Sequence, residues 1–477
     1  MTGPTTSPAV AVIGGGFSGA ALAIHLRRRY GGRSPLRIVV FEPRERLGLG
    51  LAYGTREPAH RINVPAGKMT LYPDRPESFL EFVERHGIAA KDPDCIGRDG
   101  LPYPRRSDFG AYVAQEAEPY LASGEIEHRW TAVVSVERAG SRWRVIGDDG
   151  STTVADVVAL AVSHPSPALP GALSRLAGHP KLIGDVTAPD ALDGIGVEDR
   201  VLILGNGLTS ADVVASLAEK GHRGPILSIS RRGLRSRGHP KAPQDPYGDF
   251  ASPPSVRASD LLRRIRAALK EAAGQGLSWH AVLDAVRAQG QSIWQALPVE
   301  ERRRIARLAR PYWDVHRFRI APQVEDVLDE AVAAGRLSIK AASLLKASAV
   351  DDGFDVALRE RGRVEEVRTV VDAIVVTTGP AHGGILISQP FLRKLQAEGL
   401  LTACRTGLGI ACDLRAVATG GNSQPVEGLY IVGPLARGTF GELMGLPQVT
   451  EHAVFVADRI AERLGLEEAK PGMLEAG

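Results

Sequence analysis

Near the start of the chain stands the stretch Val12-Ile13-Gly14-Gly15-Gly16-Phe17-Ser18-Gly19. It follows an apolar run and opens a run of small residues, which is the pattern of a buried parallel strand that leads into a helix. Glycine is needed at such a junction because the backbone must turn tightly and approach a diphosphate closely. The free N–H groups at the start of the helix then favour an anion. The stretch therefore predicts a nucleotide-binding turn.

The same pattern returns later as Val201-Leu202-Ile203-Leu204-Gly205-Asn206-Gly207-Leu208-Thr209-Ser210. One motif of this kind is weak evidence. Two motifs, each with its own strand and helix, predict two dinucleotides held face to face, so that electrons can pass between them. We therefore expect an α/β protein with two Rossmann-like dinucleotide-binding domains.

The end of the second strand in each unit indicates which nucleotide binds there. Residues 38–42 close on Glu42, an acid that can accept hydrogen bonds from a ribose 2′-hydroxyl and would repel a 2′-phosphate, which fits FAD or NAD. Residues 226–232 instead end on Ser230, Arg231 and Arg232, and guanidinium groups bind phosphate oxygens well. We interpret the second unit as an NADPH site. The alternative is that both arginines are solvated turn residues.

The order of the segments indicates that the NADPH domain is inserted in the FAD domain. We expect the FAD-binding domain at residues 1–170 and 381–477, and the NADPH-binding domain at residues 171–380, with an added helical insertion at about 256–335.

Strands and helices at the borders of these domains support this division. Residues 153–165 and 371–380 are two similar apolar runs, and each is expected to be a buried strand at a crossing between the domains. Residues 429–434 are expected to form the last strand of the FAD domain. A helix from about Gln448 to Leu464 is expected to follow it.

Composition agrees with an ordinary enzyme of 477 residues. The chain has 44% hydrophobic residues, 24% charged residues and a net charge of +3, which is too little charge to imply nucleic acid or an acidic membrane surface. No apolar run has the length of a membrane span, and residues 1–8 lack a signal pattern. We expect a cytoplasmic protein with a small-molecule substrate; a homo-oligomer is compatible with the sequence.

Three cysteines, Cys95, Cys404 and Cys412, form no closely spaced pair. This disfavours the flavin disulfide reductases, which need a redox-active thiol pair, and it disfavours a zinc site. His60, His239 and His452 show no metal-binding spacing either, so we expect no bound metal.

The chain resembles the two-dinucleotide flavoproteins that include the class B flavin monooxygenases. It resembles more closely a bacterial FAD/NAD(P)-binding protein family without assigned substrates. That closer resemblance rests on four stretches: residues 50–55, 62–69, 312–322 and 433–448. A looser similarity to N-hydroxylating monooxygenases adds residues 104–112. One departure is Gly433-Pro434, where many flavoproteins carry Gly-Asp.

These resemblances and the motifs together predict the site residues. The FAD-binding set is Gly14, Gly16, Phe17, Ser18, Gly19, Glu42, Met69, Val133, Gly433 and Pro447. The NADPH-binding set is Gly205, Asn206, Gly207, Thr209, Ser210, Ser230, Arg231 and Arg232.

Two polar residues are expected at the flavin. The resemblance implies that Asn63 reaches the flavin edge, where it would be a neutral donor. Gln448 begins the last helix, whose N–H groups would stabilise negative charge on the reduced flavin. The alternative for Asn63 is a purely local turn role.

The segment 310–319 is dense in groups that can orient a polar ligand. Trp313, His316 and Arg317 are predicted to contact a substrate, and the segment could instead bind the NADPH phosphates. The alternative is an ion-paired helix end that packs on the inserted helices.

The cofactors carry the predicted chemistry. NADPH would reduce FAD, and the reduced flavin would react with molecular oxygen to give a flavin hydroperoxide. We expect a monooxygenase that hydroxylates a small nitrogen-containing metabolite, such as an amino acid or an amine. The alternatives are an NADPH-dependent flavin oxidase or reductase without oxygen insertion, and a non-catalytic FAD-binding sensor.

Overall fold

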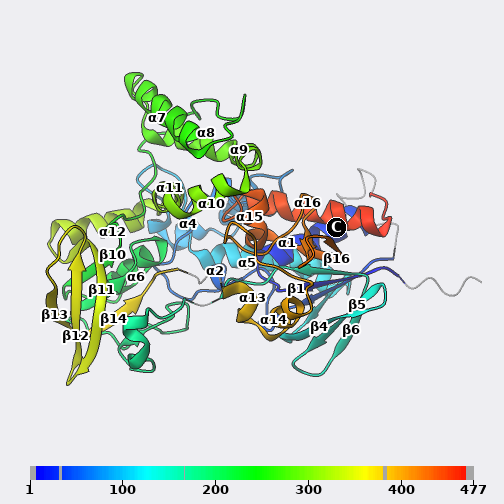
Figure 1. Cartoon of the computed structure of the whole chain (residues 1–477), viewed down its shortest axis with the longest axis horizontal. Coiled ribbons are helices and arrows are strands. Elements are labelled where there is room, and N and C mark those ends of the chain that lie inside the picture. The colour runs from blue at the N-terminus through cyan, green and yellow to red at the C-terminus, as the bar shows by residue number, and fades with distance from the viewer. Residues whose placement is uncertain (1–6, 32–34, 166, 380–383, 469–477) are drawn as a thin grey trace, which may run out of the picture.

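Two sheets with parallel cores organise the chain, which a computed structural model describes over residues 7–31, 35–165, 167–379 and 384–468. The first sheet has the strand order β15-β16-β7-β1-β2-β3 (Figure 1). All its neighbouring pairs are parallel except β15 with β16. Its strands are β1 (Ala9–Ile13), β2 (Arg37–Phe41), β3 (Ile126–Arg129), β7 (Val157–Leu160), β15 (Val417–Thr419) and β16 (Pro425–Ile431).

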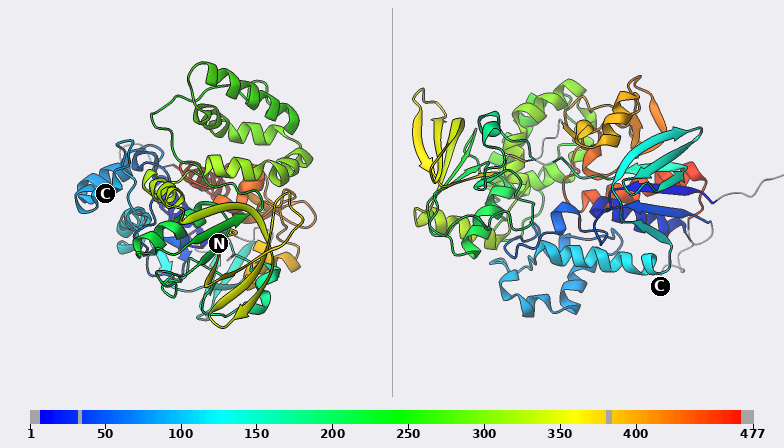
Figure 2. Two further views of the ribbon diagram at one scale, coloured as in Figure 1. Left: turned by 90° about the vertical axis from the view of Figure 1, so that its left-hand side faces the viewer. Right: turned by 90° about the horizontal axis from the view of Figure 1, so that it is seen from below.

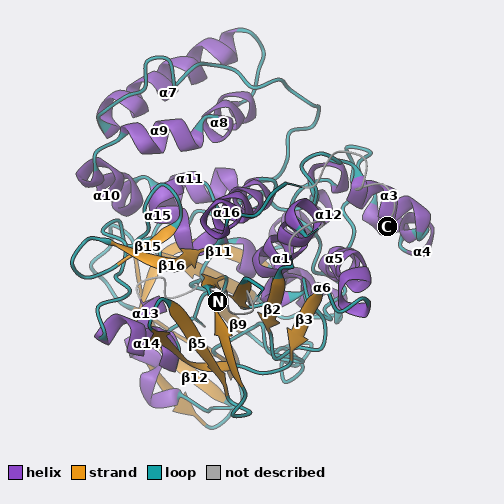
Figure 3. Cartoon of the chain, turned by 90° about the vertical axis from the view of Figure 1, so that its right-hand side faces the viewer, coloured by secondary structure: helices purple, strands orange, loops and turns teal. Residues whose placement is uncertain are grey.

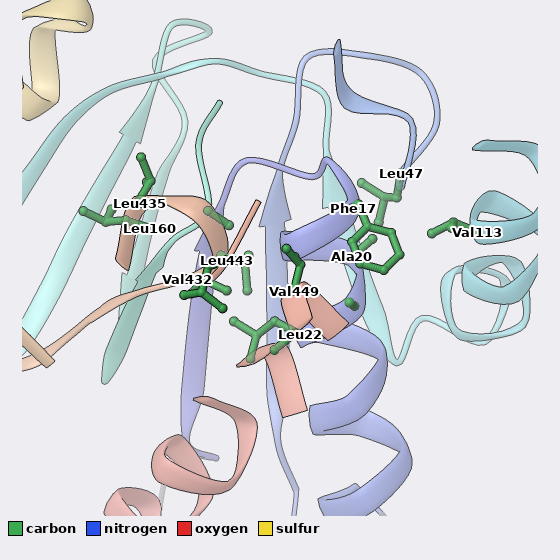
Figure 4. Packing of buried hydrophobic residues seen from close by; sticks show 14 of the residues in the cluster. Phe17, Ala20, Leu22, Leu47, Val113, Leu160, Val432, Leu435, Leu443 and Val449 are labelled. Atoms are coloured by element: carbon green, nitrogen blue, oxygen red, sulfur yellow. The ribbon is translucent and has the colours of Figure 1, made fainter. Parts of the chain in front are cut away.

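Helix α1 (Phe17–Tyr30) follows the first glycine-rich turn and packs against α16 (Gln448–Leu464), so the two ends of the sequence meet in one core. Figure 4 shows that Leu22 of α1 lies beside Val449 of α16. Val432 and Leu443 lie close to this pair. The expected helix from Gln448 to Leu464 is confirmed. The other helices of this part are α2 (Gly50–Tyr53), α3 (Ser78–Arg85), α4 (Ile88–Lys91), α5 (Arg106–Ala122), α13 (Ile385–Ser388), α14 (Pro390–Ala397) and α15 (Arg437–Phe440).

Short elements complete this unit. A separate antiparallel sheet contains β4 (Val133–Ala139), β5 (Arg142–Gly147) and β6 (Thr152–Ala155). The 3-10 turns of the chain are η1 (Ala66–Lys68), η2 (Pro93–Cys95), η3 (Gly171–Leu176) and η5 (Gly433–Ala436).

The second sheet has the order β13-β12-β11-β10-β9-β14-β8. Its parallel core continues, through the long strand β11, into an antiparallel extension with β12 and β13. This extension and the β4-β5-β6 sheet lie at opposite ends of the molecule (Figures 1 and 2). The strands are β8 (Leu182–Ile183), β9 (Val201–Leu204), β10 (Ile226–Ser230), β11 (Leu337–Val350), β12 (Gly353–Glu360), β13 (Val367–Val371) and β14 (Ala373–Val376).

The segment between β10 and β11 carries most of the helices of the second unit. Its last helix, α12 (Pro322–Ala333), packs on α6 (Leu208–Glu219), which follows the second glycine-rich turn. The others form what we call the helical lobe, with its own apolar core around Phe250, Val282 and Ile293. α7 and α8 stand apart from both sheets (Figures 1 and 3). The lobe consists of α7 (Ala258–Gly274), α8 (Trp279–Ala288), α9 (Gly290–Ala296), α10 (Val299–Leu308) and α11 (Arg310–Arg317).

The two apolar runs at the crossings differ from the prediction, because each is divided by an aspartate into two separate strands. Asp156 separates β6 from β7, and Asp372 separates β13 from β14. The Asp156 carboxylate accepts the Ala9 N–H (2.8 Å), and the Asp372 carboxylate accepts the Arg200 N–H (2.6 Å). These half-buried carboxylates gain a backbone partner in this way, and each aspartate ends one strand where the fingerprint strand of its unit begins. Position 380 lies outside the described residues.

The chain leaves the first sheet after β7 and returns to it with β15 and β16, while β8 to β14 belong to the second sheet. The domain limits near residues 170 and 380 stay predictions. Among the described residues, no helix combines the length and the apolar character needed to cross a bilayer.

Candidate active site between the two sheets

The first glycine-rich turn has the geometry of a diphosphate cradle. Gly14 has φ +97°, and a Cβ there would lie 2.7 Å from the Ala161 carbonyl oxygen. A Cβ on Gly19 would lie 1.9 Å from the Gly14 oxygen. Gly16 is the N-cap of α1 and provides no side-chain cap, so the first N–H groups of the helix keep their capacity to bind an anion. Phe17 points into the apolar core, and Ser18 stays half-buried at the turn.

Glu42 lies at the end of β2 with 4% of its surface exposed. One carboxylate oxygen accepts the Gly15 N–H (3.0 Å), and the other accepts the Arg44 backbone and side-chain N–H groups (3.1 and 2.9 Å). The acid is therefore tied to the glycine-rich turn itself. Oε2, which accepts a single hydrogen bond, can accept a further one, so the position fits a ribose hydroxyl.

The C-terminal segment closes over the first turn at Gly433. Gly433 has φ +65°, and a Cβ there would lie 2.4 Å from Ser18 Oγ, which explains why only glycine fits. Its N–H donates to His452 Nδ1 (3.2 Å). Of the remaining predicted FAD contacts, Met69 and Val133 are buried and Pro447 is half-buried at the start of α16.

The second glycine-rich turn repeats this geometry. Gly205 has φ +126°, and a Cβ there would lie 2.4 Å from the Thr377 carbonyl oxygen. Gly207 is the N-cap of α6, and a Cβ there would meet nothing within 4 Å. The backbone at Gly207 therefore faces open space, as the approach of a diphosphate requires.

Polar side chains brace this second turn. Asn206 donates to Ser230 Oγ (3.1 Å) and accepts from Ser228 Oγ (2.7 Å), which in turn lies 3.1 Å from Ser210 Oγ. Thr209 is half-buried in the first turn of α6. Asn206, Ser210 and Ser230 therefore shape the turn through their own contacts.

Arg231 and Arg232 follow β10, as predicted, and neither forms an ion pair with another described residue. Arg231 is exposed. Arg232 is half-buried, with its guanidinium carbon 5.5 Å from the ring centroid of Tyr312 in α11. Two cations without a carboxylate partner remain at the edge where the second nucleotide's ribose is expected.

Asn63 lies where the two units meet. Its side-chain oxygen is 3.4 Å from Arg106 Nη2, and its backbone carbonyl accepts from His239 Nε2 (2.7 Å). Arg106 also forms a two-pronged ion pair with Asp212 of α6 (2.9 Å for each contact). The residue predicted at the flavin edge is thus connected to the second unit from both its side chain and its backbone.

Gln448 is held by the helical lobe. Arg287 of α8 donates to Gln448 Oε1 (3.0 Å) and to the Leu446 carbonyl (2.8 Å). Burial lowers the pKa of Arg287 to about 10, and neighbouring Arg317 adds to the shift. The start of α16 therefore faces a buried, still protonated guanidinium.

The three predicted substrate residues lie in α11 but face different surroundings. Trp313 packs on the apolar core of the helical lobe, and the His316 ring meets Trp279 at 4.8 Å. These two contacts match the alternative of a helix that packs on the inserted helices. Arg317 is 8% exposed and pairs with Glu442 (2.8 Å) from the C-terminal segment. Of the three, Arg317 has contacts that reach the first unit.

Sequence reasoning missed Arg437, Arg287 and the pairing of Arg317 with Glu442. Arg437 lies in the stretch 433–448, which carries the family resemblance. The neighbouring sequence does not show that its side chain is buried beside α11. Arg287 lies in an ordinary amphipathic helix. Only the fold brings these residues together.

Two of the thiols lie against the C-terminal segment: Cys404 Sγ is beside Gly438, and Cys412 Sγ is 3.5 Å from Thr439 Oγ1. Cys95 and Cys412 are buried, Cys404 is half-buried, and none forms a disulfide. Within the described part of the chain, no three His, Cys, Asp or Glu side chains are grouped as a metal site.

Comparisons with known proteins agree with this architecture. Residues 11–165 match the model of a family described as FAD-NAD(P)-binding. This confirms the predicted dinucleotide-binding class of the first unit. No curated protein sequence is detectably similar to the chain.

Solved structures share the fold over nearly the whole chain. The reduced form of ornithine hydroxylase PvdA from Pseudomonas aeruginosa has a TM-score of 0.65 and 17% identity, with 96% of this chain and 100% of that chain covered. Ornithine N-hydroxylase KtzI from Kutzneria sp. 744, solved with reduced FAD, NADP+ and L-ornithine, has a TM-score of 0.62 and 17% identity over 96% and 99% of the two chains. L-lysine 6-monooxygenase from Pseudomonas syringae has a TM-score of 0.63 and 20% identity, also over 96% and 99%. The fold of this chain is therefore that of the two-dinucleotide flavoproteins, as its sequence predicts.

Proposed function

We propose that this protein is an FAD- and NADPH-dependent monooxygenase that hydroxylates the nitrogen of a small metabolite. The observation that carries the proposal is the position of Asn63 where the first nucleotide unit meets the second. Its contacts with Arg106 and His239 connect the first nucleotide unit to the second. The N-hydroxylases with the same fold support this choice.

The described residues fit both cofactors. The Gly16 and Gly207 helix starts have no side-chain caps, Glu42 suits a ribose diol, and Arg231 and Arg232 suit a 2′-phosphate. When bound, the pair would supply hydride transfer and activation of oxygen. The overall reaction would convert an amine, NADPH, a proton and O2 into a hydroxylamine, NADP+ and water, so that one oxygen atom enters the product and two electrons from NADPH reduce the other.

The residues of this chain would orient and shield the reaction. The Asn63 amide is a donor that stays neutral at every working pH, and its oxygen is already occupied by Arg106. That contact would leave the amide N–H groups to face the first unit. Gln448 and the N-terminus of α16 would place positive dipole ends at the flavin.

The main alternative is an NADPH oxidase or reductase that inserts no oxygen. A thiol-dependent reductase would need a redox-active pair of thiols at the flavin, whereas Cys95 and Cys412 are buried and burial raises the pKa of the Cys412 thiol to about 12, which disfavours the reactive thiolate. A non-catalytic sensor would not oxidise NADPH at all. These three functions therefore differ in oxygen and coenzyme consumption.

Rapid mixing of the NADPH-reduced holoenzyme with oxygen, across a panel of amines and amino acids, tests the proposal. A monooxygenase gives a hydroxylamine product with one substrate class and peroxide without substrate. Asn63→Ala should divert turnover to peroxide, whereas the exposed turn variant Asn422→Ala should not. Peroxide as the only product with every substrate would refute oxygen insertion, and an absence of NADPH oxidation would indicate a sensor.

A further inference from the structure

Several arginines lie close together where the helical lobe meets the C-terminal segment; Arg317 and Arg437 are buried, and the others are half-buried. We call this group the arginine cluster; it contains Arg287, Arg310, Arg317, Arg319 and Arg437. The residues come from α8, from α11 and the turn after it, and from α15, so only the fold assembles them.

Carboxylates of the protein do not balance this cluster. Arg317 pairs with Glu442, Arg319 with Asp284 and Arg310 with Asp314. Five guanidinium groups therefore meet three acids. The nearby His164 adds no further positive charge, since burial and Arg437 lower its pKa to about 4 and keep it neutral. An excess of two positive charges remains inside the protein.

Arg437 is the clearest case of an unmatched charge. It exposes 7% of its surface, forms no ion pair within the described residues, and leaves both Nε and Nη1 without a hydrogen-bond partner. A buried charge is costly unless it is paired. Burial and the neighbouring Arg310 lower its pKa to about 10, so the group is still a cation at neutral pH.

Other donors in the cluster are also unsatisfied. Arg287 Nε, Arg317 Nη2 and Arg319 Nε are buried without partners. One acceptor, Asp314 Oδ1, is in the same condition. Unmatched donors thus outnumber unmatched acceptors, and forked guanidinium donors match carboxylate geometry.

We propose that the arginine cluster binds a small dicarboxylate. If the proposed function holds, the substrate is an amine that carries two carboxylates, with its nitrogen on the side of Asp314. An excess of buried cations would repel a substrate that lacks these carboxylates and carries further protonated amines. This separates the chain from the proteins of the same fold whose structures are described for ornithine and lysine.

Calorimetric titration of the oxidised holoenzyme tests the site without turnover. Succinate should bind at least about tenfold more tightly than succinamate, in which an amide replaces one carboxylate. Inorganic phosphate is the third probe. Tighter binding of phosphate than of succinate, or equal binding of succinate and succinamate, would overturn the dicarboxylate assignment.

Arg437→Met is the decisive variant. It should weaken succinate binding about tenfold or more, while Arg303→Met, an exposed arginine on α10, should leave it unchanged. Since Arg437 has no partner in the free enzyme, Arg437→Met should not lower the Tm of the ligand-free holoenzyme. A lower Tm with unchanged succinate affinity would show a structural role. Colourless protein would assign Arg437 to the flavin. Either result overturns the proposal.

Arg317→Lys supplies a second test that keeps the charge beside Glu442 and removes the guanidinium fork. It should weaken succinate binding severalfold, and an unchanged affinity for succinate would contradict the proposed geometry.

Turnover separates this proposal from the proposed function. Succinate binding without oxygenation of any amino dicarboxylate would keep the site and refute the monooxygenase. Oxygenation of ornithine or lysine by an enzyme that does not bind succinate would refute the dicarboxylate site and support the monooxygenase.

Discussion

Replacing Arg232 with alanine should reduce the use of NADPH and leave NADH nearly unchanged. Arg232 follows β10, where a ribose-binding acid would exclude a 2′-phosphate, and no described carboxylate neutralises it. Its guanidinium is half-buried over Tyr312, which restricts its motion and partly shields it from water. These features make it the stronger of the two predicted phosphate ligands.

The expected magnitude follows from these positions. A charge-assisted hydrogen bond contributes about 1.5–3 kcal/mol, and the lower end applies to a group that solvent still reaches. Arg232→Ala should therefore lower the rate constant for flavin reduction at low NADPH about tenfold. Arg231 is exposed, so Arg231→Ala should have a smaller effect, about fivefold at most.

Stopped-flow reduction of the flavin with each coenzyme measures this. The parent enzyme should prefer NADPH over NADH at least about tenfold, and the preference should shrink as salt rises because partly exposed charges are screened. Arg223→Ala is the matched control, since Arg223 is an exposed arginine just before β10 that pairs with Glu198. Equal rates with NADPH and NADH in the parent enzyme would refute the reasoning. They would favour the alternative that both arginines are solvated turn residues.

Further predictions concern the second glycine-rich turn, acid stability and the contact between the units. Gly207→Val should fold normally and lose NADPH binding, because a Cβ at this position meets no protein atom within 4 Å. Gly205→Ala should lower the Tm, because its φ is +126° and its Cβ would lie 2.4 Å from a carbonyl oxygen. Thermal melting and coenzyme titration measure both effects. Burial lowers the pKa of His452 from 6.5 to about 3, so between these pH values only the unfolded chain takes up this proton, and the contribution of His452 to the free energy of unfolding drops by about 1.4 kcal/mol per pH unit as the pH falls. Urea unfolding of His452→Gln should show a pH slope smaller by that amount, because His25 and His239, whose pKa burial also lowers to about 4, keep their own contributions. Asp212→Asn should lower stability by about 2 kcal/mol and slow flavin reduction, since it leaves the mostly buried Arg106 without its counter-charge.

Matched variants and contrary outcomes complete these experiments. Glu219→Gln, at the exposed end of α6, should change neither stability nor reduction rate. Tight NADPH binding by Gly207→Val would show that the diphosphate does not approach this turn. An unchanged pH slope in His452→Gln would mean that His452 already takes up its proton in the folded enzyme. Full stability of Asp212→Asn would show that Arg106 finds another partner.

The glycine-rich turns were predictable because their requirements are local. Gly14 and Gly205 need positive φ, and a Cβ on either would strike the backbone of the neighbouring parallel strand. The start of α16 was predictable for a similar reason, since Pro447 directly precedes its first residue. Such signals lie within a few residues of the structure that they determine.

The divided strands at Asp156 and Asp372 were harder to predict. Each lies inside an apolar run, and periodicity alone reads such a run as one strand. The reason for the division is a hydrogen bond to the N–H of a residue far away in the sequence, Ala9 in one case and Arg200 in the other. A pattern read along one segment does not contain this information.

The arginine cluster was hidden for the same reason. Arg317 and Glu442 are 125 positions apart, and the sequence around each reads as an ordinary helix end or loop. Of the predicted substrate residues, Arg317 is the one whose contacts in the structure leave the helical lobe. The prediction chose Trp313, His316 and Arg317 because it counted polar groups along this segment, and the sequence does not show which face of α11 the lobe covers. Their role in binding a substrate stays a prediction.

Helix α11 gives this arrangement a functional consequence. Tyr312 near its first turn lies against Arg232 of the second nucleotide unit, and Arg317 at its end is paired with Glu442 of the C-terminal segment. A helix of eight residues is too short to bend, so its two ends move together. We therefore expect a nucleotide that orders Arg232 also to restrain Arg317, the member of the arginine cluster at the other end of this helix. Binding of NADPH and of a dicarboxylate should consequently strengthen each other, since each ligand would order one end of the same rigid element.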